Sequence, residues 1–211
     1  MKVFIFDFDG TIALEDTTDL ILELPGEDQI WQIEQEWAAG ALTSYQCMKA
    51  QARFLQGISV DAVHRHLRQH SHLDAAFPSL LQFLQREGFY VVLLSEGYDV
   101  SIQFHDIPKH IRTIHCSRLV TEGSRLTGDL KVWNERIWDY ADPCLGCCIC
   151  KVDFLLQLRK HHSITTSVAV GDGGSDACLF QYVDVSFSLN PKYKATYHVD
   201  NLAEVLAVLQ S

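Results

Sequence analysis

The sequence lacks a long apolar run. Its longest strictly apolar stretch is the six residues Phe89 to Leu94, whereas a helix that spans a membrane needs about 20. The apolar stretch Val3 to Phe6 is too short for the core of a secretory signal peptide, and no cleavage site follows it. We therefore expect a cytoplasmic protein.

Basic residues are also few. Lys and Arg number 17 against 27 Asp and Glu, which gives a formal net charge of −10 over 211 residues. Non-specific binding of nucleic acid requires Lys and Arg to neutralise phosphates, and docking on an anionic membrane requires a similar basic excess. We expect neither kind of partner. An apolar fraction of 47% with 21% charged residues is typical of a folded globular chain.

The sequence does not have the even number of cysteines that a complete disulfide framework needs. Its seven cysteines fit reduced thiols or metal ligands better. Four of them form a tight C-x₂-C-C-x-C cluster of Cys144, Cys147, Cys148 and Cys150. Structural zinc usually has two separated pairs of ligands, so two interpretations stay open, a zinc site or a reduced, partly buried loop.

Short apolar segments predict the strands of a parallel sheet. Several are continuous apolar runs, which suit strands covered by helices on both faces. The segments are Val3 to Phe6, Phe89 to Leu94, Thr113 to Cys116, Ser167 to Val170 and Val183 to Phe187. Residues 119–130 predict a small hairpin at the sheet edge. The length and this pattern predict an α/β fold with an inserted segment.

More than eighty residues separate the first two predicted strands, far more than an ordinary strand-to-helix connection. Most of this stretch predicts helix, over residues 28–39, 44–56, 60–70 and 78–86, with Thr43 and Ser59 as N-caps. The last helix leads into the second strand. Residues 14–73 then predict a helical cap above the carboxyl ends of the strands, where open α/β sheets bind ligands. Residues 1–13 and 74–211 would form the core.

Two acidic motifs follow two of the predicted strands. The first is Asp7-Phe8-Asp9-Gly10-Thr11, and the second runs from Gly171 to Asp176 with the sequence GDGGSD. Buried carboxylates need a divalent cation or a nearby Lys as compensation, and glycines permit close approach of the backbone to a ligand. Taken singly, each motif also fits an ordinary turn rich in Asp and Gly.

Two smaller motifs lie between the acidic ones. Ser95 follows the second predicted strand and precedes Glu96 and Gly97; its hydroxyl can hold a phosphate oxygen or cap a helix. Lys151 begins a predicted helix over residues 152–159, and a single Lys is by default exposed to solvent. The functional interpretation of Lys151 depends on the other three motifs. Together the four motifs predict one site, since the first, second and fourth stand at strand ends.

This order of motifs resembles the haloacid dehalogenase-like superfamily over nearly the whole chain. The insertion after the first motif is similar to the helical cap of the branch that contains phosphoserine phosphatase. The resemblance implies a Rossmann-like core of three layers and a phosphomonoester phosphatase for a small phosphorylated metabolite. It implies Asp7 as the nucleophile that forms an aspartyl-phosphate, Asp9 as general acid and then base, and Lys151 as the neutralising cation.

The resemblance also implies Mg²⁺ as the cofactor. Asp7 and Asp172 would supply carboxylates and Asp9 its backbone carbonyl, with Asp176 as a ligand or a support behind the ligands. At about 4 Å two like charges repel by roughly 4 kcal/mol at an effective dielectric of about 20. A divalent cation would offset this repulsion between the nucleophile and the phosphate.

The second motif would complete the phosphate site through Ser95, Glu96 and Gly97, with Ser95 orienting the phosphoryl oxygens. The charge of Glu96 beside a phosphate leaves three interpretations. The side chain points away, it pairs with a cation such as Lys151, or it indicates a different substrate.

The cap is expected to choose the substrate, and the sequence leaves that substrate open. Asp16 stands nine residues after Asp7, where phosphoserine phosphatases carry a Glu that meets the substrate amine. Their carboxylate-binding Arg falls at about Gln51 here. The Cys-rich tract before Lys151 resembles instead the methionine-salvage phosphatases, which act on 2-hydroxy-3-keto-5-methylthiopentenyl-1-phosphate. A non-catalytic binder of phosphate ligands is a further alternative, and the oligomeric state stays open.

Overall fold

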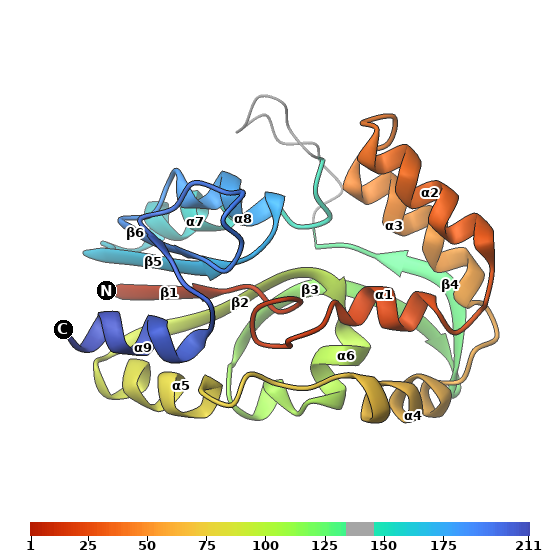
Figure 1. The fold of residues 1–211 in the computed structure, drawn as a ribbon, viewed down its shortest axis with the longest axis horizontal. Helices are drawn as coiled ribbons and strands as arrows, with labels where there is room; N and C mark the ends of the chain where they lie inside the picture. Colours follow the sequence, from red (N-terminus) through yellow and green to blue (C-terminus); the bar gives the residue numbers. More distant parts are fainter. Residues whose placement is uncertain (134–145) are drawn as a thin grey trace.

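A mostly parallel sheet forms the centre of the molecule in the computed structural model, which describes residues 1–133 and 146–211. Within these ranges the strand order is β4-β3-β2-β1-β5-β6-β7, and neighbours are parallel except β3 and β4 (Figure 1). The strands are β1 (Lys2–Phe6), β2 (Phe89–Tyr98), β3 (Thr113–Glu122), β4 (Arg125–Lys131), β5 (Thr166–Gly171), β6 (Val185–Ser188) and β7 (Tyr197–His198). The predicted α/β class is confirmed.

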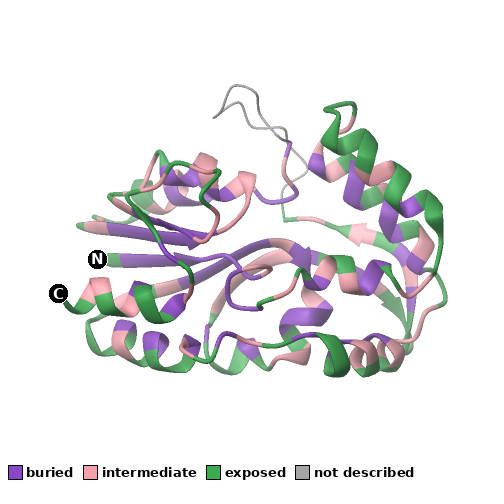
Figure 2. Cartoon of the chain, in the orientation of Figure 1, coloured by how far each residue is buried: buried purple, intermediate pink, exposed green. Residues whose placement is uncertain are grey.

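Helices cover both faces of this sheet and create three layers. The helices α5 (Phe77–Arg86) and α9 (Leu202–Gln210) lie on one face, and α7 (Lys151–His161) and α8 (Gly174–Phe180) lie on the other (Figure 1). Alternate residues of β1 enter the two apolar clusters that result. Because both faces are covered, the central strands are buried along most of their length (Figure 2), which explains their continuous apolar runs.

The strand β2 runs further than predicted. Its pairing with β1 ends at Leu93, but its pairing with β3 shifts register after Leu94 and resumes at Tyr98. Because one neighbour continues where the other stops, the strand extends past the predicted end at Leu94. Ser95, Glu96 and Gly97 therefore lie inside the irregular end of β2, not after the strand as predicted.

Four helices occupy the segment between β1 and α5. They are α1 (Thr17–Leu22), α2 (Asp28–Ala38), α3 (Ser44–Ala52) and α4 (Val60–His70). Thr43 and Ser59 accept backbone hydrogen bonds as the N-caps of α3 and α4, as predicted. The predicted helix over 44–56 is too long. Its last residues form the 3-10 turn η1 (Arg53–Leu55), after which the backbone of residues 57 and 58 pairs with Leu126 of β4.

The predicted hairpin over residues 119–130 is confirmed by β3 and β4, which extend beneath the cap helices. Cap residues such as Ile21 and Leu67 share one apolar cluster with Tyr98, Leu119 and Leu126. This cluster also packs against α6 (Asp99–Phe104), which is followed by the turn η2 (Ile107–Lys109).

The two ends of the segment between β1 and α5 lie side by side, because Ala13 and Leu73 form an isolated antiparallel bridge. The division into a core of residues 1–13 and 74–211 and a cap of residues 14–73 stays a prediction. In the parts of the chain that the structure describes, no helix has the length and apolar character needed to cross a membrane.

Candidate active site

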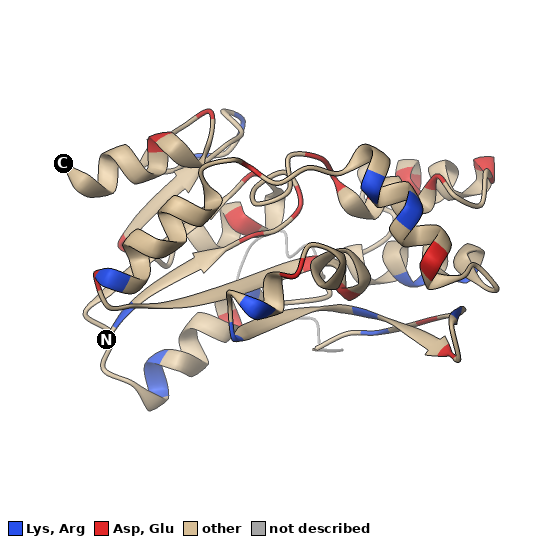
Figure 3. Cartoon of the chain, turned by 90° about the horizontal axis from the view of Figure 1, so that it is seen from below, with Lys and Arg blue, Asp and Glu red and all other residues tan. Residues whose placement is uncertain are grey.

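The four motifs meet at the carboxyl ends of β1, β2 and β5, where acidic segments lie in the connecting loops (Figure 3). Asp7 directly follows β1, and its N–H donates to the carbonyl of Val170 in β5. Asp172 directly follows β5, and Asp176 lies in the first turn of α8. Lys151 is the first residue of α7. Residues far apart in the sequence thus come together at the carboxyl ends of the central strands.

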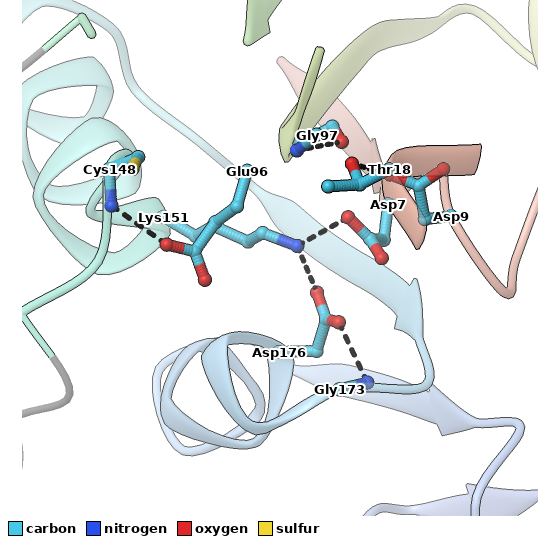
Figure 4. A network of polar contacts seen from close by, with 10 residues as sticks. Asp7, Asp9, Thr18, Glu96, Gly97, Cys148, Lys151, Gly173 and Asp176 are labelled. Atoms are coloured by element: carbon cyan, nitrogen blue, oxygen red, sulfur yellow. Dashed lines mark hydrogen bonds and ion pairs between the residues drawn. The ribbon is translucent and has the colours of Figure 1, made fainter. Parts of the chain in front are cut away.

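Lys151 is buried between two carboxylates. Its Nζ lies 2.6 Å from Asp7 Oδ1 and 2.7 Å from Asp176 Oδ1 (Figure 4). Burial opposes the charge of the ammonium group, but Asp176 and Asp7 outweigh it and raise the pKa of Lys151. The lysine is therefore charged at neutral pH, and its default exposure to solvent does not apply here.

Three carboxylates crowd around this one lysine. Ligand oxygens of Asp7, Asp172 and Asp176 all lie within 4.8 Å of one another. Burial and the charge of Asp176 raise the pKa of Asp7 well above its usual value, against the opposing effect of Lys151. The same two causes raise the pKa of Asp172 to about 6. A single ammonium leaves negative charge unbalanced, so the oxygen donors fit a divalent cation of the Mg²⁺ kind.

Two glycines permit this crowding. A Cβ on Gly10, whose φ is +65°, would lie 2.4 Å from Asp172 Oδ2, and a Cβ on Gly171 would lie 2.1 Å from Asp176 Cγ. Any other residue at either position would displace a carboxylate. Gly10 and Gly171 are thus required for close approach, as the sequence suggested for glycines of these motifs.

Asp9 is bonded to the beginning of the cap. Its Oδ1 accepts hydrogen bonds from Thr17 N at 2.9 Å and Thr17 Oγ1 at 2.5 Å, and its Oδ2 accepts one from Thr18 Oγ1 at 3.4 Å. Burial, and then the charge of Asp16, raise the pKa of Asp9 to about 7. A carboxyl group with that pKa can both give and take a proton near neutral pH.

The second motif places a glycine against Asp9. Ser95 is buried, and its Oγ accepts a hydrogen bond from Gly97 N at 3.0 Å. A Cβ on Gly97 would lie 2.0 Å from Asp9 Oδ2, so the close contact requires glycine. The roles of Ser95 and Gly97 in binding a phosphate stay predictions.

Glu96 joins β2 to the segment that precedes α7. Its Oε1 accepts a hydrogen bond from Cys148 N at 2.7 Å, so the carboxylate turns toward that segment (Figure 4). The ion pairs of Lys151 within the described residues go to Asp7 and Asp176, not to Glu96. Burial raises the pKa of Glu96, while the Cys148 N–H and the charge of Lys151 oppose that rise.

Residues 146–150 also contact the cap. The carbonyl of Gly146 accepts from Tyr45 N, and Cys148 Sγ lies 3.5 Å from Met48 Sδ. At the end of the segment, Cys150 Sγ accepts from Asp153 N and caps α7. Glu96 thus helps to hold residues 146–150, the segment that directly precedes Lys151, in place.

The cysteines of this segment do not converge on a metal among the described residues. Cys148 faces Met48, whereas Cys150 caps a helix. Burial raises the pKa of Cys147 and of Cys148, which disfavours the thiolate that binds zinc. Cys144 lies outside the described residues. Within the described residues, the side chains that lie close enough together to hold a metal ion are those of Asp7, Asp172 and Asp176, the aspartate cluster.

Asp16, a predicted substrate contact, and Gln51, which stands where the carboxylate-binding Arg of phosphoserine phosphatases was expected, both have partners within the protein. The contact of Asp16 with a substrate stays a prediction. Asp16 is the N-cap of α1, and its Oδ1 accepts from Thr18 N and Asp19 N. Gln51 is buried, and its Nε2 donates to Glu34 Oε2 at 2.9 Å and to the carbonyl of Ile30 at 3.5 Å. The amide of Gln51 is therefore not available to a carboxylate of a substrate.

Sequence reasoning missed the threonines that hold Asp9. Thr17 and Thr18 stand at the start of α1, a short helix that the apolar pattern did not predict. A signal was present, because Asp16 followed three residues later by Asp19 is a helix-start pattern.

The bond between Glu96 and Cys148 gives a prediction about stability. Glu96→Ala leaves the buried Cys148 N–H without its partner and should lower the free energy of unfolding by about 1–3 kcal/mol. Glu96→Gln keeps an acceptor oxygen and should retain most of that stability.

The difference in stability between Glu96→Gln and the wild type is also expected to depend on pH. A folded-state pKa above the unfolded value means that ionisation of Glu96 costs stability as pH rises through the raised pKa. Glu96→Gln should therefore compare more favourably with the wild type at pH 8 than at pH 5 in urea unfolding. Exposed Glu122 provides Glu122→Ala and Glu122→Gln as controls, and equal losses for the two alanine variants would contradict the assigned contact.

Comparisons with known proteins agree with this geometry. The model of the haloacid dehalogenase-like hydrolase family matches residues 4–181. The phosphoserine phosphatase of Methanocaldococcus jannaschii is 24% identical over 99% of this chain and 98% of its own length. The pyridoxal phosphate phosphatase PHOSPHO2 of Mus musculus is 25% identical over 94% of this chain and 85% of its own length.

A solved phosphoserine phosphatase, described as a phospho-aspartyl intermediate analogue, has the same fold. It superimposes with a TM-score of 0.78 at 23% identity and covers 98% of both chains. The resemblance expected from the four motifs is confirmed. This chain, a phosphatase, belongs to the haloacid dehalogenase-like hydrolase family.

Proposed function

We propose that the protein is a Mg²⁺-dependent phosphomonoester phosphatase that acts on a small metabolite, with Asp7 as its nucleophile. The observation that carries this proposal is the position of Asp7. Its carboxylate is buried at the end of β1, and its Oδ1 is bonded to Lys151. Its Oδ2 makes no hydrogen bond within the described part of the chain, which leaves that oxygen available to attack phosphorus.

The aspartate cluster supports the choice of Mg²⁺. Asp7, Asp172 and Asp176 would hold the cation, and the carbonyl of Asp9 stays a predicted ligand. When bound, Mg²⁺ would lower the electrostatic repulsion between the carboxylate of Asp7 and the phosphate.

The protein's own residues divide the reaction into two steps. In the first, Asp7 attacks phosphorus while Asp9 gives its proton to the departing alcohol, which produces an aspartyl-phosphate. In the second, Asp9 takes a proton from water as that water attacks phosphorus, which releases phosphate and restores Asp7. The pKa of Asp9, about 7, suits a group that must first donate and then accept a proton. Lys151 stays charged beside Asp7 throughout.

We propose a small phosphoester as the substrate. The sequence left the methionine-salvage ester, phosphoserine and other small esters open. The curated relatives named phosphoserine phosphatase support a compound of the phosphoserine class at least as well as the methionine-salvage ester. The net charge of −10 still supports a partner that is neither nucleic acid nor a membrane. The cytoplasmic location stays a prediction.

Release of phosphate from p-nitrophenyl phosphate and a panel of small phosphoesters tests this function. We expect release with Mg²⁺, loss of release with EDTA, and a fall of at least about a thousandfold for Asp7→Asn, because the attacking carboxylate is gone. Asp61→Asn changes an exposed acid of α4 and is the matched control. Binding of phosphate by folded protein without turnover of any ester would instead indicate a binding protein.

A second prediction concerns the contact between Gly97 and Asp9. Gly97→Ala would push a Cβ against Asp9 Oδ2, and displacement of a reacting group by about 1 Å can cost up to about a hundredfold in rate. We therefore expect a lower kcat on p-nitrophenyl phosphate. Gly173→Ala is the matched control, because its Cβ would meet Asp176 Oδ2 at an ordinary 3.5 Å. Equal activity of the two folded variants would show that the contact with Asp9 has no catalytic importance.

A further inference from the structure

Residues 146–150, which we call the connecting segment, lead from the cap to Lys151. Cys148 is fully buried and belongs to the apolar cluster that the cap helices form with β3 and β4. Leu155, four residues after Lys151, belongs instead to the cluster that α7 and α8 form with the central strands. Lys151 therefore lies where the chain passes from one apolar cluster to the other.

Two contacts join the connecting segment to the cap helix α3. The carbonyl of Gly146 accepts a hydrogen bond from Tyr45 N at 3.0 Å. Tyr45 is the second residue of α3, and the first N–H groups of a helix have no partner within that helix, so the connecting segment supplies one from outside. Cys148 Sγ lies 3.5 Å from Met48 Sδ on the same helix. The helix α3 therefore holds the segment at two points.

The core holds the same segment at two further points. Glu96 Oε1 accepts a hydrogen bond from Cys148 N at 2.7 Å (Figure 4). Cys150 Sγ accepts one from Asp153 N at 3.4 Å and so caps α7 directly before Lys151. Cys148 is thus held from two sides, by its side chain to the cap and by its backbone to β2.

The contact between the connecting segment and the cap requires a glycine. Gly146 has a φ of +61°, which residues with a side chain rarely adopt. A Cβ at this position would lie 2.6 Å from Thr43 Cβ and 2.7 Å from Thr43 Cγ2. Because Thr43 is the N-cap of α3, a single added methyl group would push the segment away from the start of that helix.

The position of Lys151 is sensitive to such a shift. Lys151 is the first residue of α7, and its Nζ lies within hydrogen-bond distance of both Asp7 and Asp176. Displacement of a reacting group by about 1 Å can cost up to about a hundredfold in rate. Since the connecting segment joins directly to Lys151, a change in its contact with the cap moves the first turn of α7.

We propose that Gly146 and Cys148 are positioning residues for Lys151, which reaches Asp7 only while α3 holds the connecting segment. The cap thereby affects the rate of the reaction through the protein's own backbone. This inference rests on the proposed phosphatase function, in which Lys151 stays charged beside Asp7.

The experiment measures kcat and KM of Gly146→Ala for p-nitrophenyl phosphate. We expect kcat to fall by at least about tenfold while KM changes by less than about threefold, because Lys151 acts on the charge that develops during the reaction. Gly123→Ala is the matched control, since Gly123 has a φ of +59° but its Cβ would meet nothing within 4 Å among the described residues. Equal kcat in the two folded variants would overturn the proposal.

A compensating substitution separates this contact from general damage to the fold. Thr43→Gly removes the atoms that the new Cβ of Gly146→Ala would meet, and glycine is also a suitable N-cap residue. Added to Thr43→Gly, Gly146→Ala should lower kcat by less than about threefold, which would show that the two positions are coupled. A fall as large as in the wild-type background would overturn the proposal.

Met48→Ala tests the cap contact without strain at residue 146, and it serves equally if Gly146→Ala does not fold. The change removes the side chain that Cys148 meets and should lower kcat by at least about fivefold. Leu67→Ala is its control, because Leu67 belongs to the same apolar cluster but lies on α4.

Equal kcat in folded Met48→Ala and Leu67→Ala would overturn the positioning role while the phosphatase function stands. Failure of the wild type to hydrolyse any ester would instead overturn the phosphatase function, and with it this inference.

Discussion

The structure depends on one buried ammonium group that lies between two buried carboxylates. Removing Lys151 would leave Asp7 and Asp176 as uncompensated charges in a site that water reaches poorly, and breaking such a buried pair typically costs about 3–5 kcal/mol. The burial of Lys151 between Asp7 and Asp176 constrains other parts of the chain. The helix α7 must begin at the sheet edge, and Gly10 and Gly171 must leave room for the carboxylates.

The same arrangement leaves the site with too little positive charge, and its chemistry follows from that imbalance. Three carboxylates face one lysine, so a divalent cation and the attack of Asp7 on a phosphate are electrostatically compatible at one place. Asp9 is held by its bonds to Thr17 and Thr18. Burial and the charge of Asp16 raise its pKa to about 7, which suits a group that exchanges protons.

The sequence predicted those features that depend on local pattern. The continuous apolar run of β1 indicated a strand covered on both faces, and Thr43 and Ser59 indicated the starts of two helices. The meeting of Asp7 with Lys151, 144 residues apart, followed from the order of the motifs and not from any local pattern. The role of Glu96 could not be predicted, because its partner Cys148 is 52 residues away and uses a backbone N–H that no motif marks. The extension of β2 depends on its unequal pairing with two neighbours.

The most direct test of this account is a calorimetric titration of the protein with Mg²⁺, compared with Asp172→Asn. Asp172 belongs to the carboxylate cluster but forms no ion pair with Lys151 within the described residues, so its change spares the buried pairs. The account predicts about one Mg²⁺ per chain for the wild type and an affinity at least about tenfold weaker for Asp172→Asn. No binding at millimolar Mg²⁺, or equal affinity in the variant, would contradict it.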